Sequence, residues 1–434
     1  MKMKQRLAGR LRVPGDKSIS HRALIFSVLS RGRSTVLGLS PAGDCLSTIN
    51  CLRALGIVIE RQGEEGEQVY CIESAGLNKL KPPLSTLDAG NSGTTIRLMA
   101  GVAAGQAFET VFDGDESLRA RPMARVLDPL LKMGAQVNFL HKSGCAPLSI
   151  KGGGLHGIGY QAPVASAQVQ TALLLAGLQA HGQTVVGLPG PVRDHTLRLF
   201  RHLNVPYKLD DAGRCVVARL ESPIPPYHVD VPADLSSAAF FLVAAALLPG
   251  SNLVLTGVGV NPGRTLVIDV LRRMGAEIAV VNECTVSGEP VADLHVSYNG
   301  RLKGVTIDGA ELAAGIDEIP ILAVAGALCS GRLCVRGASE LRVKESDRIS
   351  AIVSNLKAAG AKVEEAADGF DIEGQEELAG GSQWLTCGDH RLTMTGLIAG
   401  LVAIKEIIVD NRACAAVSYP GFEADLAAVL KPGY

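Results

Sequence analysis

Short runs of β-branched residues alternate along the chain with longer stretches rich in alanine and leucine. Each short run ends at a turn that contains glycine or asparagine, and these turns recur at intervals of 70 to 80 residues. Taken in order, the turn residues are Gly38, Gly114, Gly187, Gly257, Gly337 and Asn411. Self-similarity at a fixed period is typical of proteins that repeat one supersecondary unit. The pattern therefore predicts six related units.

A helix rich in apolar residues precedes the strand of each predicted unit. The six helices start with small or polar residues, in the stretches GDKSISHRALIF, GNSGTTIRLMAG, ASAQVQTALLLAG, ADLSSAAFFLVAA, IDEIPILAVAGAL and GDHRLTMTGLIAG. In five units a second helix follows the strand, ends at a glycine and leads into a further strand, as in LRRMGAEIAV at 271–280. The pattern predicts an α/β fold made of units that are roughly βαβαββ.

The composition indicates a globular protein with a well-filled core and little net charge. Its 434 residues are 47% hydrophobic and 20% charged, and this length is enough for two or more domains. The formal net charge is -1, so the chain has no broad basic surface for a nucleic acid backbone. We therefore expect local anion binding and a small-molecule ligand, and no nucleic acid partner.

The sequence contains no pattern for a membrane span, a disulfide framework or a metal site. Its longest apolar run, at 238–248, has about half the ~20 residues that a membrane span needs, and it predicts a buried helix. The ten cysteines form no C-x-x-C pair, and the nine histidines form no H-E-x-x-H motif. We expect a cytoplasmic protein with reduced thiols, no membrane partner, no metal and no cofactor.

The stretch at 11–26, LRVPGDKSISHRALIF, gathers anion-binding residue types at the first helix start. It is no P-loop, because Asp16 precedes Lys17 directly and the first glycine of that motif is missing. We expect instead that Ser18 or Ser20 caps a helix whose free N–H groups attract an anion. The alternative is an ordinary capped helix with solvated charges.

If the six units pack with pseudo-symmetry, the like ends of their first helices converge and their free N–H groups form one electropositive focus. The polar residues at these helix starts are then candidates for the functional site. They are Lys17, Ser18, Arg22, Asn91, Gly93, Thr94, Arg97, Ser166, Gln168, Asp317, His390 and Arg391. Three further stretches, at 117–123, 192–200 and 340–349, add arginine and lysine.

Nine motifs follow one another along nearly the whole chain. In order, they are PGDKSISHR, LDAGNSGTTIRL, RARPM, SAQVQTALL, RDHT, DLSSAAFFL, IDEIP, RVKESDRI and GDHR. With these motifs the chain resembles the 5-enolpyruvylshikimate-3-phosphate synthases of the enolpyruvyl transferase family. The resemblance implies a two-domain, pseudo-symmetric inside-out α/β barrel of six βαβαββ units, three per domain.

The resemblance also implies where the domains divide. We expect an N-terminal domain at 14–228, on the shikimate 3-phosphate side, and a C-terminal domain formed by 1–13 and 229–434. The ligands are expected in the cleft between the domains. Prolines near both crossings suit a hinge. The chain is expected to be a monomer.

The reaction implied by the resemblance transfers the enolpyruvyl group of phosphoenolpyruvate to the 5-hydroxyl of shikimate 3-phosphate and releases phosphate, on the route to chorismate and the aromatic amino acids. The resemblance places phosphoenolpyruvate on Lys17, Gly93, Arg121, Gln168, Arg348 and Arg391. It places shikimate 3-phosphate on Ser18, Arg22, Ser166, Arg193, Asp317 and Lys344. Asn91 and Thr94 are further substrate-binding candidates. Arginine suits such sites because its planar fork binds carboxylate or phosphate through two parallel bonds.

Two proton transfers are needed to form the tetrahedral intermediate of this reaction. Glu345 is the candidate acid that protonates the methylene carbon, and Asp317 is the candidate base on the hydroxyl. Lys17 is a candidate proton shuttle. The alternative for the KESDR stretch is a solvated charge run on a helix, in which Lys344 and Arg348 are merely neighbours one turn apart.

The chain departs from the family pattern at two places. Val417 stands where many members carry a lysine, so one cation for the phosphate of phosphoenolpyruvate is absent or supplied elsewhere. The RDHT motif replaces the serine and tyrosine of another branch. Glyphosate, which occupies the phosphoenolpyruvate site in this family, is expected to inhibit; Gly93 favours this inhibition and Val417 weakens it.

Two rival functions remain to be compared. An enolpyruvyl transferase that acts on UDP-N-acetylglucosamine has asparagine after its lysine and a cysteine acid in a loop, whereas here Ser18 follows Lys17 and the loop with Arg119 and Arg121 has no cysteine. A non-catalytic repeat protein that binds phosphorylated ligands would have no use for both Asp317 and Glu345.

Overall fold

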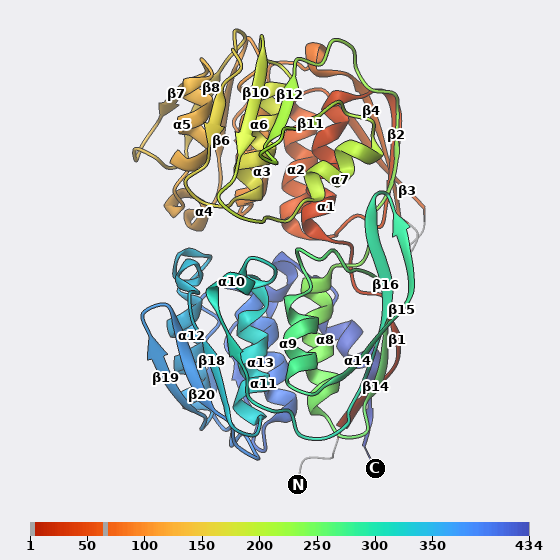
Figure 1. The fold of residues 1–434 in the computed structure, drawn as a ribbon, viewed down its shortest axis with the longest axis vertical. Coiled ribbons are helices and arrows are strands. Elements are labelled where there is room, and N and C mark those ends of the chain that lie inside the picture. The colour runs from red at the N-terminus through yellow and green to blue at the C-terminus, as the bar shows by residue number, and fades with distance from the viewer. Residues whose placement is uncertain (1–4, 64–67, 434) are drawn as a thin grey trace. The chain divides into compact units, whose positions relative to one another are not determined.

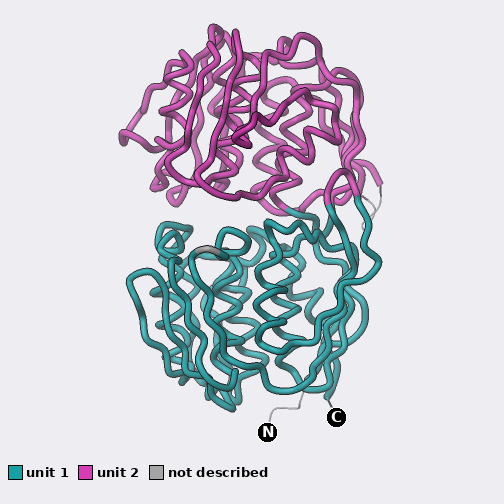
Figure 2. Tube along the Cα trace, in the orientation of Figure 1, with its two compact units in different colours: residues 1–16, 232–285, 290–434 teal, residues 17–231, 286–289 magenta. Residues whose placement is uncertain are grey.

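The computed structural model describes residues 5–63 and 68–433 (Figure 1). The chain forms two compact units (Figure 2): unit 1 comprises 1–16, 232–285 and 290–434, and unit 2 comprises 17–231 and 286–289. The chain therefore passes from one unit to the other after residues 16, 231, 285 and 289.

These boundaries differ from those that the sequence predicts, which follow residues 13 and 228. The backbone amide of Asp16 donates to the carbonyl of Pro232 at 2.8 Å, and the amide of Asp234 donates to the carbonyl of Pro14 at 2.8 Å. This pairing keeps 14–16 in unit 1 beside the segment that begins at Pro232.

Nothing in the sequence predicts that residues 286–289 belong to unit 2. The backbone amide of Asp230 donates to Ser287 Oγ at 2.8 Å, and His195 Nδ1 lies 2.8 Å from Glu289 Oε1. His195 and Glu289 are both buried, so this turn between two strands is fixed firmly within unit 2.

Three four-stranded sheets in unit 2 share one strand order, with a parallel first pair followed by two antiparallel pairs. The first is β13 (His228–Asp230), β2 (Arg31–Leu37), β4 (Val69–Ala75) and β3 (Val58–Gln62). The second is β5 (Leu87–Asp88), β6 (Glu109–Asp113), β8 (Leu148–Lys151) and β7 (Gln136–Phe139). The third is β9 (Gly159–Gln161), β10 (Gln183–Gly187), β12 (Cys215–Ala218) and β11 (Lys208–Leu209).

The helices that precede β2, β6 and β10 pack on one another inside unit 2. They are α1 (Lys17–Ile25), α3 (Gly93–Ala103) and α6 (Ala167–Gly177). Nearly all residues of α3 and α6 are buried, as their all-round apolar sequences require. The other helices of this unit are α2 (Gly43–Ala54), α4 (Glu116–Ala120), α5 (Ala124–Lys132), α7 (His195–His202) and the 3₁₀ turns η1 (Phe26–Leu29) and η2 (Leu77–Lys79).

Unit 1 repeats the same central arrangement of helices. Its three packed helices are α8 (Leu235–Leu247), α11 (Ile319–Leu328) and α13 (His390–Val402). The run at 238–248 falls on α8, and its burial confirms the prediction of a buried helix. The others are α9 (Leu266–Arg273), α10 (Gly309–Leu312), α12 (Arg348–Ala358), α14 (Phe422–Val429) and the 3₁₀ turns η3 (Ile316–Glu318), η4 (Ser339–Val343) and η5 (Arg412–Val417). No helix in the described ranges has the length and apolar character to cross a membrane.

The sheets of unit 1 are less uniform. A five-stranded sheet contains β15 (Glu277–Val286), β16 (Glu289–Ser297), β14 (Asn252–Gly259), β1 (Gln5–Leu11) and β23 (Leu430–Pro432). A four-stranded sheet contains β17 (Thr306–Ile307), β18 (Arg332–Val335), β20 (Gly369–Glu373) and β19 (Lys362–Ala366). A pair contains β21 (Gln383–Trp384) and β22 (Ile408–Val409). Among the described residues the last repeat has only this pair, and the final strand, β23, pairs with β1.

Close approach of α3 and α6 generates a stability prediction. A Cβ on Gly101 would overlap the backbone of Ala172 in α6, whereas a Cβ on Gly400 in α13 would lie at an ordinary 3.8 Å from Ile407. Alanine normally stabilises a helix interior by about 1 kcal/mol relative to glycine. We expect Gly101→Ala to lower the free energy of unfolding by about 1–3 kcal/mol, because the backbone of Ala172 cannot move aside for the new methyl group. Urea denaturation measures the free energy of unfolding of Gly101→Ala and of the control, Gly400→Ala. Equal values for the two variants would contradict this account.

Candidate functional site

The starts of the central helices of unit 2 are joined by side-chain hydrogen bonds. Gln168, in the first turn of α6, donates through Nε2 to Thr94 Oγ1 in α3 at 3.0 Å. Arg97 Nη1 donates back to Gln168 Oε1 at 3.1 Å. Ser166 caps α6 by accepting from the amide of Val169, as a serine at this position is expected to do. Thr94, Ser166 and Gln168 are thus brought together as the sequence predicts for helix starts.

The start of α1 differs from the expectation for its serines. The helix begins at Lys17, so Ser18 and Ser20 lie inside it and neither occupies the capping position. Ser20 Oγ instead accepts a hydrogen bond from the amide of Ser40 at 2.9 Å. Lys17 Nζ lies 2.8 Å from Asp44 Oδ2, a carboxylate in the first turn of α2. The structure therefore gives Lys17 a carboxylate partner that the sequence did not indicate.

Arg22 links three helices in the interior of unit 2. Its side chain donates to Thr196 Oγ1 of α7 at 2.7 Å, to the carbonyl of Ser18 at 2.9 Å and to Thr171 Oγ1 of α6 at 3.0 Å. Only 3% of the residue is exposed. A contact between Arg22 and shikimate 3-phosphate stays a prediction.

Arg121 and Asn91 form a polar group beside the start of α3. Arg121 Nη2 donates to Asn91 Oδ1 and to Ser117 Oγ, each at 3.1 Å, and Asn91 Nδ2 donates to Asp115 Oδ2 at 2.8 Å. Arg193, in the irregular segment before α7, is partly buried. The site candidates of unit 2 form what we call the unit 2 cluster: Lys17, Ser18, Arg22, Asn91, Gly93, Thr94, Arg97, Arg121, Ser166, Gln168 and Arg193.

Gly93 stands directly beside two guanidinium groups. A Cβ on Gly93 would lie 2.7 Å from Arg97 Nη1 and 3.5 Å from Arg121 Nη1. A methyl group at Gly93 would therefore meet Arg97 first. A substitution at Gly93 therefore acts on the cation that holds Gln168.

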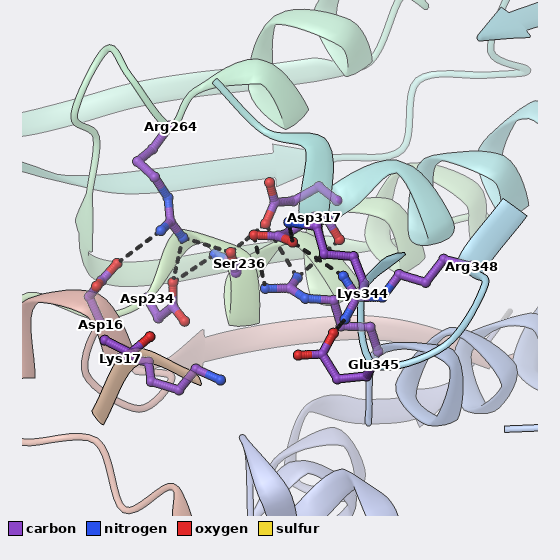
Figure 3. A network of polar contacts seen from close by, with 12 residues as sticks. Asp16, Lys17, Asp234, Ser236, Arg264, Asp317, Lys344, Glu345 and Arg348 are labelled. Atoms are coloured by element: carbon purple, nitrogen blue, oxygen red, sulfur yellow. Dashed lines mark hydrogen bonds and ion pairs between the residues drawn. The ribbon is translucent and has the colours of Figure 1, made fainter. Parts of the chain in front are cut away.

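Arg348, the first residue of α12, is at the centre of the polar residues of unit 1 (Figure 3). Nη1 lies 3.2 Å from Asp317 Oδ1, Nη2 lies 2.6 Å from Glu345 Oε2, and Nε lies 2.7 Å from Asp389 Oδ2. The side chain is 2% exposed. Burial disfavours its charge, but the carboxylates of Asp389, Glu345 and Asp317 outweigh burial and raise the pKa of Arg348.

Asp389 is a further member of this polar group, and the sequence did not single it out. It caps α13 by accepting from the amide of Arg391 at 2.8 Å, and its other oxygen binds Arg348 and Ser346 Oγ. Burial works to raise its pKa, but the charges of Arg348 and His390 prevail and hold the pKa of Asp389 below its ordinary value. The GDHR motif contained a signal for Asp389, because this aspartate stands just before a helix and two residues before a candidate arginine.

Asp317, in η3, faces three cations. Besides Arg348, Lys344 Nζ lies 3.7 Å from its Oδ1 and Arg391 Nη2 lies 3.9 Å from its Oδ2. The structure thus brings together all the catalytic and binding candidates of unit 1. We call Asp317, Lys344, Glu345, Arg348, Asp389 and Arg391 the unit 1 cluster.

A second buried arginine continues this network towards the start of α8 (Figure 3). Arg264 Nη2 lies 3.0 Å from Asp234 Oδ1 and 2.6 Å from Ser236 Oγ, and Nη1 lies 3.7 Å from Asp16 Oδ2. Burial works against the charge of Arg264, but Asp16 and Asp234 raise its pKa. Burial, followed by the charge of Asp16, raises the pKa of Asp234 to about 6. Arg264 lies outside every motif and was not predictable from the sequence.

His390, also a candidate, follows Asp389 directly in the sequence, and its charge helps to lower the pKa of that aspartate. His390 is buried in the first turn of α13, and Val417 is the last residue of η5. Within 5–63 and 68–433, no group of three or more histidine, cysteine, aspartate or glutamate side chains has the arrangement of a metal site.

Comparison with known protein families shows to which family this chain belongs. The model of EPSP synthase (3-phosphoshikimate 1-carboxyvinyltransferase) matches residues 1–426. The chain belongs to this family. The resemblance of its motifs to EPSP synthases is thereby confirmed.

Curated relatives in the EPSP synthase family match nearly the whole chain. The 3-phosphoshikimate 1-carboxyvinyltransferase of Geobacter metallireducens is 47% identical over 416 residues, which cover 96% of this chain and 95% of the relative. The protein of the same name from Geotalea uraniireducens is 45% identical over 432 residues, which cover 100% and 99%.

Solved structures agree with the α/β fold. EPSP synthase from Acinetobacter baumannii has a TM-score of 0.87 and 39% sequence identity, and the match covers 99% of this chain and 97% of that one. The enolpyruvyl transferase NikO from Streptomyces tendae has a TM-score of 0.81 over 99% of each chain. Its identity is 16%, so this likeness concerns the fold alone.

The buried pair of Asp389 and Arg348 generates a second prediction. Asp389→Asn keeps an oxygen that can cap α13 but removes the charge that faces Arg348, so we expect the free energy of unfolding at pH 7 to fall by about 3 kcal/mol or more. Because the folded pKa of Asp389 is lowered, its contribution is complete above the ordinary value of 3.8 and is lost as the pH falls through the folded pKa.

Chemical denaturation between pH 3 and pH 7 measures this difference. Asp269→Asn, on the exposed face of α9, is the control and should change the stability little at any pH. A penalty for Asp389→Asn that stayed constant down to pH 3, or none at pH 7, would contradict the ion-pair account.

Proposed function

We propose that this chain transfers the enolpyruvyl group of phosphoenolpyruvate to the 5-hydroxyl of shikimate 3-phosphate and releases phosphate. One observation carries the proposal: Asp317 and Glu345 are bound to the two terminal nitrogens of one arginine, Arg348. Two carboxyl groups held at a fixed separation can supply the acid and the base that this reaction needs. Membership of the EPSP synthase family supports the same activity.

Arg348 also explains how the acid is controlled. A carboxylate held by a guanidinium cannot donate a proton, and Glu345 is held by Arg348 Nη2 at 2.6 Å. We propose that the anionic phosphoenolpyruvate takes over the contacts of Arg348 and Arg391, so that Glu345 is released to accept a proton from solvent water and pass it to the methylene carbon. Asp317 then removes the proton of the 5-hydroxyl.

The unit 2 cluster supplies the remaining binding groups in this proposal. Lys17, Arg121 and Gln168 would contact phosphoenolpyruvate at its carboxylate and phosphate. Gly93 would let phosphoenolpyruvate approach the start of α3. Ser18, Arg22, Ser166 and Arg193 would hold shikimate 3-phosphate. Asn91 and Thr94 would be further substrate-binding residues. Charge-assisted bonds of this kind contribute about 1.5–3 kcal/mol each.

The unit 1 cluster holds both candidate proton-transfer carboxylates, and the unit 2 cluster holds most of the residues that would bind shikimate 3-phosphate. Lys344, in the unit 1 cluster, would add a cation for that phosphorylated substrate.

For the fold we propose the pseudo-symmetric inside-out α/β barrel of six βαβαββ units. The common strand order of the three sheets of unit 2 and of the β17–β18–β20–β19 sheet supports it. The central position of the helices in each unit also supports it, because the apolar helices are inside and the sheets are outside. The two-stranded pair β21–β22 belongs to the βαβαββ repeat that differs most from the other repeats.

Phosphate release tests the activity directly. The purified chain with phosphoenolpyruvate and shikimate 3-phosphate should release phosphate, and the reaction should survive excess chelator. With UDP-N-acetylglucosamine in place of shikimate 3-phosphate no phosphate should appear. Release only with the nucleotide sugar, or with neither acceptor, would overturn the proposed function.

Glu345→Gln is expected to lower kcat by about two orders of magnitude or more, because the amide cannot supply the proton that the transition state needs. The Michaelis constants for both substrates should change by no more than a few-fold. Steady-state kinetics measures both quantities. Glu377→Gln, an exposed surface change, is the control, and near-normal kcat in Glu345→Gln would remove Glu345 from the acid role.

Gly93→Ala is expected to weaken inhibition by glyphosate at least tenfold, about 1.4 kcal/mol. The methyl group would displace Arg97 Nη1 and crowd Arg121, so the cations beside the start of α3 would shift. Inhibition constants against phosphoenolpyruvate measure the effect. Gly154→Ala is the control, because a Cβ on Gly154 would meet no atom of the described residues within 4 Å. Unchanged inhibition in Gly93→Ala would show that Gly93 is remote from the inhibitor.

A further inference from the structure

Glu318 is a buried acid for which the proposed reaction has no use. It follows Asp317 directly at the end of η3, yet the two side chains have different surroundings. The side chain of Asp317 is 16% exposed and lies near Lys344 and Arg348, whereas Glu318 is 1% exposed. A buried carboxylate without a partner costs several kcal/mol, so its partners explain why it is tolerated.

The partners of Glu318 come from the starts of two other central helices. Its Oε1 accepts a hydrogen bond from Ser236 Oγ in the first turn of α8 and lies 3.4 Å from Arg391 Nη1 in the first turn of α13. No donor among the described residues reaches Oε2. The carboxylate is therefore held through a single oxygen by α8 and α13 together.

Ser236 joins Glu318 to a second buried cation. Its hydroxyl donates to Glu318 and accepts from Arg264 Nη2 at 2.6 Å, which uses the hydroxyl as both donor and acceptor. Arg264 is fixed in turn by Asp234 at 3.0 Å and by Asp16 at 3.7 Å (Figure 3). The position of Glu318 is thus set by a rigid, almost fully buried group, and not by Arg391 alone.

Arg391 has two acidic residues within reach. Nη1 donates to the carbonyl of Asp317 at 3.1 Å and to Glu318 Oε1, whereas Nη2 lies 3.9 Å from Asp317 Oδ2. Without the charge of Glu318, the attraction of the Asp317 carboxylate would be unopposed. A guanidinium that closed on Asp317 would lose donors for a substrate anion.

We propose that Glu318 is a positioning residue for Arg391: anchored through Ser236 to Arg264, it draws the guanidinium away from the Asp317 carboxylate and keeps its remaining donors available to phosphoenolpyruvate. This inference rests on the proposed function of Arg391. It assigns to unit 1 a buried support for the binding arginine that lies outside the proton-transfer groups.

Glu318→Gln tests the proposal because glutamine keeps the shape and the acceptor oxygen but loses the charge. We expect the KM for phosphoenolpyruvate to rise about tenfold, while the KM for shikimate 3-phosphate changes less than twofold and kcat less than threefold. Ser236→Ala, which removes only the anchor, should raise the same KM about threefold. The Ser236→Ala variant carries the test if Glu318→Gln does not fold.

Glu311→Gln is the matched control, because it breaks an ion pair with Arg273 outside the unit 1 cluster and should leave all three constants unchanged. An unchanged KM for phosphoenolpyruvate in Glu318→Gln, an equal rise in both KM values, or a loss of kcat alone would overturn the proposal. Lack of activity in the unmodified chain would instead refute the proposed function, so the two failures are distinguishable.

Discussion

The buried guanidinium of Arg348 is the interaction on which the functional part of unit 1 depends. It carries a charge in an almost fully buried position, and only the three carboxylates of Asp317, Glu345 and Asp389 compensate the cost of removing that charge from water. Because these carboxylates come from η3, the segment before α12 and the cap of α13, one cation fixes three chain segments that are far apart in sequence. The geometry of the candidate acid and base follows from it.

A second buried arginine lies at the start of α8, where Arg264 pairs with the carboxylates of Asp234 and Asp16. Ser236 and Glu318 connect Arg264 to Arg391, and Asp317 connects Arg391 to Arg348. The helix starts of α8, α11 and α13 therefore share one polar network. Buried networks of this kind are stable only when nearly every member is paired, and such pairing makes them rigid. Rigid placement is what a site for two anionic substrates requires.

Unit 2 positions its groups mainly by close packing and by hydrogen bonds that arginine side chains donate to neutral acceptors. Gly101 lets α3 and α6 approach until a single methyl group would not fit between them, and this places Gln168 against Thr94 and Arg97. Buried Arg22 ties α1 to α6 and α7. The candidates Thr94 and Gln168 therefore stand on helices whose separation is fixed by backbone contact.

The sequence by itself determined the repeated elements, the buried character of α8 and the family, because hydrophobic periodicity and contiguous motifs are local properties. It also named Lys17, Asp317, Glu345, Arg348 and Arg391, each of which lies inside such a motif. Only the tertiary structure decided the partners: Asp44 for Lys17, Asp389 for Arg348, Arg264 and Glu318 around Ser236, and residues 286–289 within unit 2. Which charged side chains pair with one another depends on how helix starts that are tens of residues apart in the sequence pack together. A local sequence pattern carries no information about that packing.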